Sequence, residues 1–168
     1  MMKKSSIPII YVLVLCMLFS CAEDSGENTN ENLPVTRQTL LVGKIWVLAA
    51  QTITPARARV ANGPVITDWY ADMLPCERDA QKIYFFNGDL VFDEGATRCE
   101  DTDVQTFAGS WTFNADETII TELQQNFINI IRSYKIIELT ENTLVIERQD
   151  NFFGLVTHTI VERYVNEG

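Results

Sequence analysis

The side chains best suited to acid–base or metal chemistry are carboxylates gathered in the segment 93–103. Several carboxylate oxygens together suit Ca²⁺, but Asp101-Thr102-Asp103 is not followed by the glycine and terminal glutamate of an EF-hand loop. A glycosidase needs two carboxylates held across a cleft, one with a raised pKa, and nothing in the sequence places two acids in that way. We therefore expect a solvated loop, no metal site, no cofactor and no catalytic residue. The acids are Asp93, Glu94, Glu100, Asp101 and Asp103.

Histidine and basic side chains within apolar segments are the next candidates for chemistry. The only histidine, His158, has threonine on both sides, and a lone histidine on a strand is expected to face solvent. Four basic residues interrupt apolar segments, where an inward orientation would suit a ligand carboxylate such as that of a fatty acid. We favour the outward orientation for the group and keep Arg132 as a candidate ligand contact. The four are Arg132, Lys135, Arg148 and Arg163.

Aromatic residues are candidates either for the core or for ligand contacts. Trp46 and Trp111 are expected to pack in the core rather than to stack on a ligand. Trp69 and Tyr70 lie in a segment, 54–75, that contains several prolines and a glycine and reads as an ordered insertion or long loop. Two interpretations of Trp69 remain open: an exposed lid or partner contact, or a side chain buried when the loop folds back.

Further aromatic side chains occur in segments with strand character, where they would fill or line an apolar interior. An eight-stranded barrel is just wide enough to be filled by side chains or to hold one small ligand, and the sequence leaves both possibilities open. The candidate ligand-binding residues are Trp69, Tyr70, Tyr84, Phe86, Tyr134 and Arg132.

The N-terminus has the pattern of an export signal. Lys3 and Lys4 precede an uncharged, largely apolar run, Ile7–Phe19, which is shorter than the roughly 20 residues that span a bilayer. Residues 1–20 are therefore predicted to be a signal peptide, with an uncleaved anchor as the alternative. The run ends in Leu18-Phe19-Ser20-Cys21, which resembles the lipobox of bacterial lipoproteins. This resemblance implies cleavage before Cys21, its modification with lipid including palmitate, and residence in the cell envelope as an outer-membrane lipoprotein.

Residues 21–38 are acidic and have no apolar periodicity, so they are predicted to be a flexible tether. Removal of Lys3 and Lys4 would change the net charge from −10 to −12. This charge argues against a nucleic-acid partner and against electrostatic docking on anionic lipid. Acids directly after a lipid-bearing cysteine resemble the signal that sends some lipoproteins to the outer face, so periplasmic and surface locations both remain open.

The remaining two cysteines, Cys76 and Cys99, form an even pair in a chain expected to be exported. In an oxidising compartment such a pair predicts a disulfide, which would stabilise the fold by roughly 3–4 kcal/mol in the chain-entropy model. A zinc site is the alternative, but the sequence has no CxxC and its histidine is remote from both cysteines.

Strand signals dominate the rest of the chain, and Asn87-Gly88 predicts a type I′ hairpin turn. The segment 127–139 fits a strand or a helical stripe, and its isoleucines favour a strand with Ile128, Ile130, Tyr134 and Ile136 on one face. Eight short strands with mostly short connections predict an all-β, up-and-down antiparallel barrel. The expected strands are 45–53, 82–86, 90–92, 105–113, 118–123, 127–139, 143–148 and 155–165.

The order of several motifs is similar to that of the lipocalin-like lipoproteins of Gram-negative bacteria, over residues 39–165. They are Leu41–Trp46, Pro75–Asp79, Asp93–Cys99, Gly109–Phe113 and Ile137–Thr140 before Leu144–Ile146. The resemblance implies one lipocalin-like barrel domain, residues 39–168, expected to be monomeric.

From this resemblance we expect a protein that is not an enzyme and that binds a small apolar or amphipathic molecule in the barrel. The alternative is a filled barrel that acts as an interaction module and engages a basic protein through the 54–75 segment. A cavity of a few hundred Å³ would favour the first expectation over the second.

Overall fold

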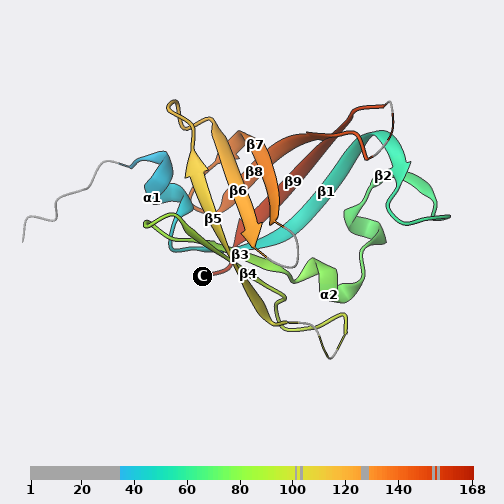
Figure 1. Ribbon diagram of the computed structural model, residues 1–168, viewed down its shortest axis with the longest axis horizontal. Coiled ribbons are helices and arrows are strands. Elements are labelled where there is room, and N and C mark those ends of the chain that lie inside the picture. The colour runs from blue at the N-terminus through green and yellow to red at the C-terminus, as the bar shows by residue number, and fades with distance from the viewer. Residues whose placement is uncertain (1–34, 101, 103, 126–128, 153, 155) are drawn as a thin grey trace, which may run out of the picture. The chain divides into compact units, whose positions relative to one another are not determined.

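The strands that follow the N-terminal region close into a barrel, as the ribbon in Figure 1 shows. The computed structural model describes residues 35–168 except 101, 103, 126–128, 153 and 155. Within this part of the chain, β1 and β3–β9 form an eight-stranded antiparallel barrel, and β2 pairs with β1 outside it. The prediction of an all-β, up-and-down, eight-stranded barrel is therefore confirmed.

The described helices are short and the strands carry most of the structure. The helices are α1 (Arg37–Leu41), the 3₁₀ helix η1 (Tyr70–Asp72) and α2 (Pro75–Arg78). The strands are β1 (Ile45–Ala58), β2 (Val65–Asp68), β3 (Gln81–Tyr84), β4 (Asp89–Asp93), β5 (Thr106–Phe113), β6 (Ile119–Gln125), β7 (Asn129–Leu139), β8 (Thr143–Asp150) and β9 (His158–Asn166).

The barrel closes through β1, which pairs with a strand on each side. Val47 lies opposite Gln81 of β3 and opposite Val165 of β9. Each barrel strand therefore has a paired neighbour on both sides, which removes most of the free edge at which sheets aggregate. The folded part begins before the predicted boundary at residue 39, since α1 starts at Arg37 with Thr36 as its N-cap. The predicted signal peptide and residues 21–34 of the tether lie outside the described residues.

The hairpin predicted at Asn87-Gly88 forms, but its turn differs from the prediction. β3 ends at Tyr84, the loop is 85–88, and of these residues only Gly88 has a positive φ, of 88°. Trp111 accounts for the difference: its indole N–H donates to the Phe85 carbonyl (3.0 Å) and its backbone N–H to the Gly88 carbonyl (2.8 Å). These bonds hold residues 85–88 as a longer loop, so the prediction that the strand continues through Phe86 is wrong.

The segment 54–75 is an ordered extension of the barrel rather than a long loop. β1 continues past the predicted end at Ile53 to Ala58, and β2 folds back on it with Ala58 opposite Val65. Trp69 is buried in a small cluster with Ile53 and Ile160. The interpretation that the segment folds back and buries Trp69 is therefore correct, and the exposed lid is not formed.

The segment predicted as strand or helix at 127–139 is the strand β7. Tyr134 and Ile136 are buried and Ile130 is partly buried, whereas Ile131 and Ile137 are exposed. Burial alternates from one residue to the next along β7, and this alternation confirms the predicted inward face. Ile128 lies outside the described residues.

The main core fills the barrel end beside α1. The side chains of Leu41 and Trp46 are fully buried there, and the Trp46 indole N–H donates to the Leu41 carbonyl at 2.8 Å. Trp111 is also buried and packs edge-on against Tyr84 and Phe113. The prediction that Trp46 and Trp111 belong to the core is confirmed.

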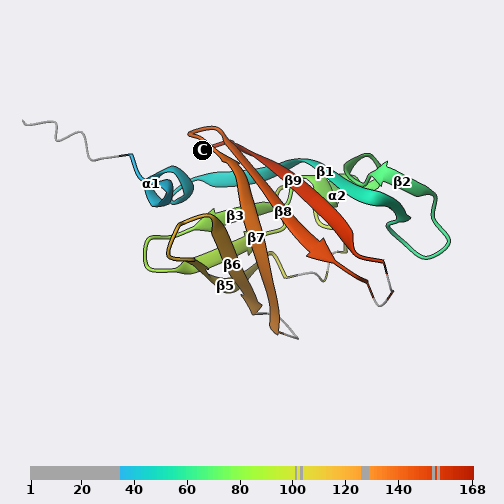
Figure 2. The ribbon, with the colours of Figure 1, turned by 90° about the horizontal axis from the view of Figure 1, so that it is seen from above.

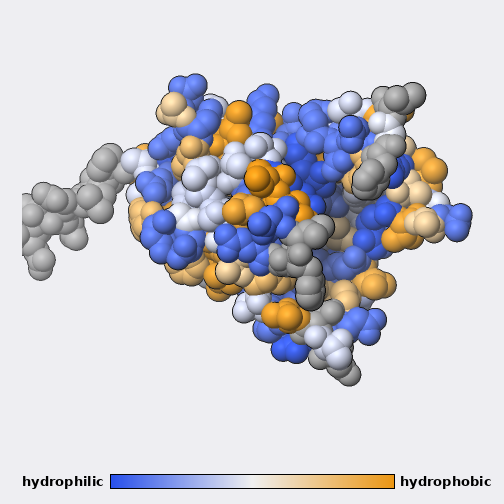
Figure 3. Space-filling model, in the orientation of Figure 1, coloured by the Kyte–Doolittle hydropathy of each residue, from blue (hydrophilic) through white to orange (hydrophobic). Residues whose placement is uncertain are grey.

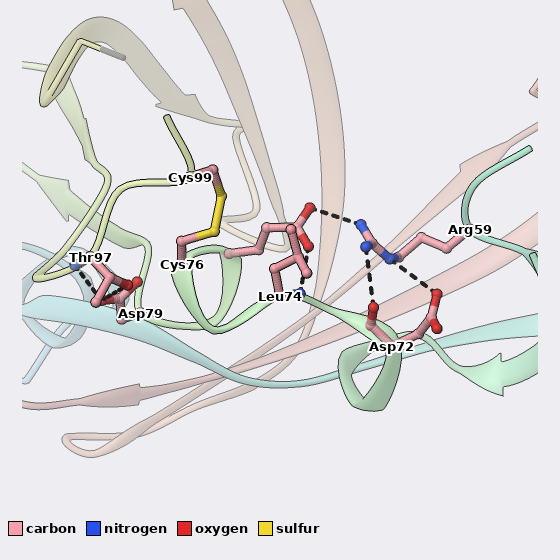
Figure 4. Close-up of a disulfide and its surroundings, with 8 residues drawn as sticks. Arg59, Asp72, Leu74, Cys76, Asp79, Thr97 and Cys99 are labelled. Atoms are coloured by element: carbon pink, nitrogen blue, oxygen red, sulfur yellow. Dashed lines mark hydrogen bonds and ion pairs between the residues drawn. A yellow bond between two sulfur atoms is a disulfide. The ribbon is translucent and has the colours of Figure 1, made fainter. Parts of the chain in front are cut away.

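A disulfide between Cys76 and Cys99 joins α2 to the connection between β4 and β5 (Figure 4), as predicted. Beside it, Arg59 forms an ion pair with Glu77 of α2 at 2.8 Å. The acidic segment 93–103 ends β4 and enters that connection, and one Asp93 oxygen accepts hydrogen bonds from the Gly95 N–H and the Gln105 side chain. Asp101 and Asp103 lie outside the described residues.

Candidate functional site

The inward-facing side chains change from apolar to polar along each of several strands. In β6 the sequence of inward residues runs Ile120, Glu122 and Gln124, beginning at the end beside α1. In β8 Ile146 is followed by Arg148, which has a side chain only 13% exposed. Because neighbouring strands repeat this change, polar groups collect inside the barrel at the end away from α1. This polar interior is the candidate site.

One half of the site is built around the carboxylate of Glu122. Lys82 forms an ion pair with it at 3.0 Å, and the Tyr84 hydroxyl donates to it. The Lys82 ammonium also lies 5.0 Å from the ring centroids of both Tyr134 and Tyr164. Cations are attracted to aromatic faces at this distance, so the lysine is held by charge and by the tyrosine rings.

The other half surrounds the carboxylate of Glu162. The Gln51 amide donates to it at 2.9 Å and the Tyr164 hydroxyl at 2.8 Å, while the Arg148 guanidinium lies 3.8 Å away. Both glutamates are therefore buried among hydrogen-bond donors and cations.

Burial and neighbouring charges shift the pKa values of the site in one direction. Burial alone would lower the pKa of Lys82, but Glu122, the nearby tyrosines and Glu162 outweigh it and raise that pKa well above its ordinary value. Burial and the charge of Glu122 raise the pKa of Tyr84, and burial raises those of Tyr134 and Tyr164. At neutral pH the lysine is charged and the tyrosines are protonated. These groups supply fixed charges and hydrogen-bond donors rather than a base.

These side chains surround a cavity of about 300 Å³ inside the barrel. Its walls come from β1, β3, β4, β6, β7, β8 and β9, so the space lies within the ring of strands. Three of the lining residues are cationic and two are carboxylates. The lining residues are Gln51, Lys82, Phe92, Glu122, Gln124, Arg132, Tyr134, Arg148, Glu162 and Tyr164.

The structure brings together half of the predicted ligand-binding residues. Arg132 and Tyr134 line the cavity, and Tyr84 is bonded to Glu122 in its wall. The other three lie elsewhere. Trp69 is buried outside the cavity, Tyr70 is in η1 beneath the Arg78 guanidinium, and Phe86 is 67% exposed in the β3–β4 loop.

The outward orientation favoured for the basic residues is correct for Lys135 and Arg163 and wrong for Arg148, whereas Arg132 lies where a ligand contact was expected. Lys135 and Arg163 are exposed, whereas Arg132 and Arg148 line the cavity. Strand register explains the difference: Arg132 shares a face with buried Tyr134, and Arg148 shares a face with buried Ile146. Lys135 and Arg163 occupy the opposite faces of their strands.

The expectation that His158 faces solvent is wrong. Its side chain is buried, and its Nδ1 lies 2.9 Å from the Pro55 carbonyl oxygen. The extension of β1 through Pro55 covers the start of β9, and the Phe152 ring packs against the imidazole with centroids 5.8 Å apart.

Lys82, Glu122, Glu162 and Gln51 were not predicted to belong to a site. A signal for three of them exists in the sequence, because each charged residue stands two positions from an apolar or aromatic residue that is buried. Glu122 follows Ile120, Glu162 lies between Ile160 and Tyr164, and Lys82 precedes Tyr84 at that spacing. A charged residue on a strand therefore indicates a site when the residues two positions away, which point the same way, belong to the core.

No protein-family model, curated protein or solved structure matches this chain. The resemblance to lipocalin-like lipoproteins therefore stays a prediction. Within the described part of the chain, no helix has the length and apolar character needed to cross a membrane.

The outer surface mixes residue types. Figure 3 shows hydrophobic residues in small separate groups among hydrophilic ones on the face that carries β5, β6 and β7. Single exposed apolar residues are normal on a soluble surface. The cavity inside the barrel therefore remains the stronger candidate for a site.

Proposed function

We propose that this protein binds a small amphipathic molecule inside the barrel. The observation that carries the proposal is the cavity of about 300 Å³, which has charged walls and lies against an apolar core. Ligand pockets begin at about this size. A ligand with a polar group would place that group against the charged walls and its apolar part toward Phe92 and the tyrosine rings.

The energetics of buried charge support this proposal. Removing two charges from water costs several kcal/mol per ion, and a buried ion pair is often no more stabilising than apolar residues of similar volume. Two apolar side chains in place of Lys82 and Glu122 would therefore stabilise the fold about as well. Recognition of a polar group is a reason for keeping them in the barrel.

The protonation states favour binding over catalysis. A lysine that acts as a nucleophile or base needs a lowered pKa, whereas the pKa of Lys82 is raised. The tyrosines likewise hold their protons more strongly than usual. The site is suited to fixed hydrogen bonds and charge, so we propose a binding protein and not an enzyme.

Fluorescent titration with N-phenyl-1-naphthylamine, an apolar probe with one amine, tests the proposal. The protein used is the chain from residue 21 onward with Cys21→Ser, exported from cells with a cleavable signal. We expect saturable binding that weakens about tenfold in Gln124→Phe, because this residue lines the cavity. Gln125→Phe, on the exposed face of the same strand, is the matched control and should bind as the parent does.

Two results would overturn the proposal. One is a folded protein, by circular dichroism, that does not bind the probe; this would favour a filled barrel that acts as an interaction module. The other is equal binding by the Gln124→Phe and Gln125→Phe variants, which would place the probe outside the cavity.

We also propose that the protein is anchored in the cell envelope by lipid on Cys21. The support is the sequence Leu18-Phe19-Ser20-Cys21 after an apolar run. Metabolic labelling of the full chain with radioactive palmitate should label the parent and the Cys16→Ser variant, and should not label Cys21→Ser. Label that persists in Cys21→Ser would contradict this assignment.

A further inference from the structure

β7 and β8 are paired over only part of their lengths. Among the described residues, their ladder runs from Leu139 opposite Leu144 to Lys135 opposite Glu147. Beyond that point residues 129–134 pair with β6, and residues 148–150 pair with β9. Figure 2 shows the two strands diverging at this end. The barrel wall is therefore split at the end where the polar site lies.

The split forms a cleft of about 520 Å³. Arg132 and Arg148 line both this cleft and the barrel cavity, so the two spaces meet at these two residues. The remaining lining residues of the cleft are Ile130, Ile131, Ser133, Gln149, Asp150, Asn151 and Thr157.

The two arginines differ in their partners. Arg148 is paired with Asp150 at 2.6 Å and lies 3.8 Å from Glu162. Arg132 donates to the neutral amide oxygen of Gln124 at 3.5 Å, and among the described residues no carboxylate forms an ion pair with it. In the cavity Lys82 is compensated by Glu122. Of the three cations that line the two spaces, Arg132 is therefore the one without an ion pair among the described residues, and it lies where the cleft meets the cavity.

This local charge stands out in a chain with a net charge of −10. A guanidinium group presents a planar fork of donors that fits the oxygens of a carboxylate, sulfonate or phosphate. Ile130 and Ile131 add apolar surface beside it, and Ile131 is 69% exposed. The cleft thus combines a cation with apolar flanks, which matches an amphiphile with an acidic group.

We propose that the cleft between β7 and β8 is a side entrance to the barrel cavity, where Arg132 and Arg148 bind the acidic group of an anionic amphiphile. This inference rests on the proposed function, because it names the chemical class of ligand for the same cavity. It adds a recognition residue, Arg132, and a route of access.

Two probes with the same ring system separate charge recognition from binding itself. 8-Anilinonaphthalene-1-sulfonate carries a sulfonate, and N-phenyl-1-naphthylamine lacks it. In Arg132→Gln the Kd for the sulfonate should rise about tenfold, the size expected for loss of a charge-assisted hydrogen bond. The Kd for the neutral probe should change several times less, because that probe has no acidic group for the guanidinium to bind. Lys135→Gln removes an exposed cation from the other face of β7 and should change neither.

The results distinguish failure of this inference from failure of the proposed function. Binding of the neutral probe with no selective effect of Arg132→Gln on the sulfonate overturns anion recognition and leaves the binding function intact. An equal loss for Arg132→Gln and Lys135→Gln also overturns it, since that indicates long-range charge alone. Failure of the folded parent to bind either probe overturns both proposals.

Stopped-flow kinetics test the route of access. Ser133→Trp places a large side chain in the cleft, and Lys135→Trp places the same side chain where β7 and β8 are still paired. Ser133→Trp should slow association and dissociation of both probes about tenfold with little change in Kd. Unchanged rates in Ser133→Trp would show that the probes enter elsewhere and would overturn the entrance.

Discussion

The two ends of the barrel are built by the same strands and use opposite chemistry. The end beside α1 buries apolar and aromatic side chains such as Trp46 and Ile146, and the Trp46 indole N–H donates to a backbone carbonyl. The other end buries Lys82, Glu122 and Glu162 around a cavity. Burial of apolar surface stabilises a fold directly, whereas buried charges need compensation to break even. The first end supplies stability, and the second holds the site.

The most damaging change should be truncation at the apolar end. Trp46→Ala removes a fully buried side chain and should lower the free energy of unfolding by about 3–5 kcal/mol. Phe86→Ala is the control, since Phe86 is exposed in the β3–β4 loop, and should change stability by no more than about 0.5 kcal/mol. Urea denaturation followed by circular dichroism measures both. Equal losses would mean that the apolar end is not the main source of stability.

A change at the polar end should be damaging only when it leaves a charge without its partner. Glu122→Gln leaves the Lys82 ammonium buried without its ion pair and should cost about 3–5 kcal/mol. The triple variant Lys82→Met, Tyr84→Phe, Glu122→Leu removes the whole group that meets at Glu122. It should recover most of the lost stability and still bind the anionic probe less tightly than the parent.

The triple variant separates stability from function at this end. If it is as unstable as Glu122→Gln, the ion pair stabilises the fold and the contrast between the two ends is wrong. If it is stable and binds the anionic probe as the parent does, the group around Glu122 does not take part in recognition.

The polar end is also held by a covalent link. Cys76→Ser with Cys99→Ser opens the disulfide between residues separated by 23 positions. The loss should be about 3 kcal/mol, from the greater entropy of the unfolded chain. Thermal unfolding of the double variant against the parent measures it. Cys76→Ser alone should lose a similar amount, and an undiminished melting temperature would contradict the assignment.

The sequence predicted the apolar end far better than the polar end. Apolar residues at every second position predict which side of a strand is buried, and this pattern can be recognised within one strand alone. It predicts the burial of Trp46 and Trp111 and the inward face of β7. The disulfide follows from an even pair of cysteines in a chain that the sequence predicts to be exported. These features depend on local pattern and on count, so one sequence is enough to predict them.

The site depends on which charged residues lie on the same face of a strand as the core residues. Rules that consider one residue at a time predict the opposite orientation for them. Charged residues are rarely buried unless paired, so Arg148 was expected to face solvent, although Ile146 two positions earlier places it inward. His158 is buried by Pro55 and Phe152, which lie far from it in sequence or beyond a turn. The partners of Lys82 come from β6, β7 and β9, and only the tertiary fold brings them together.

The smallest effect we predict concerns Asp150, at the rim of the cleft. Partial burial alone would raise its pKa, but hydrogen bonds from the Phe152 N–H and Arg148, with the positive charge of the arginines, lower it below the ordinary 3.8. A lowered pKa means that the folded state favours the carboxylate, so the stability from Asp150 is present above pH 3.8 and is lost as the pH falls through the lowered value.

Asp150→Asn should therefore be slightly less stable than the parent at pH 7, with the difference shrinking in acid below pH 3.8. The same variant frees Arg148 from its 2.6 Å partner, so binding of 8-anilinonaphthalene-1-sulfonate should tighten by about two- to threefold at pH 7, a fraction of a charge-assisted hydrogen bond. Gln149→Asn, a change of similar size at the neighbouring residue, should change neither the stability nor the binding of this probe. Weaker binding by Asp150→Asn would mean that Asp150 positions Arg148 for the ligand. The polar end would then be a preorganised site, and not one in which carboxylates compete with the ligand for the arginines.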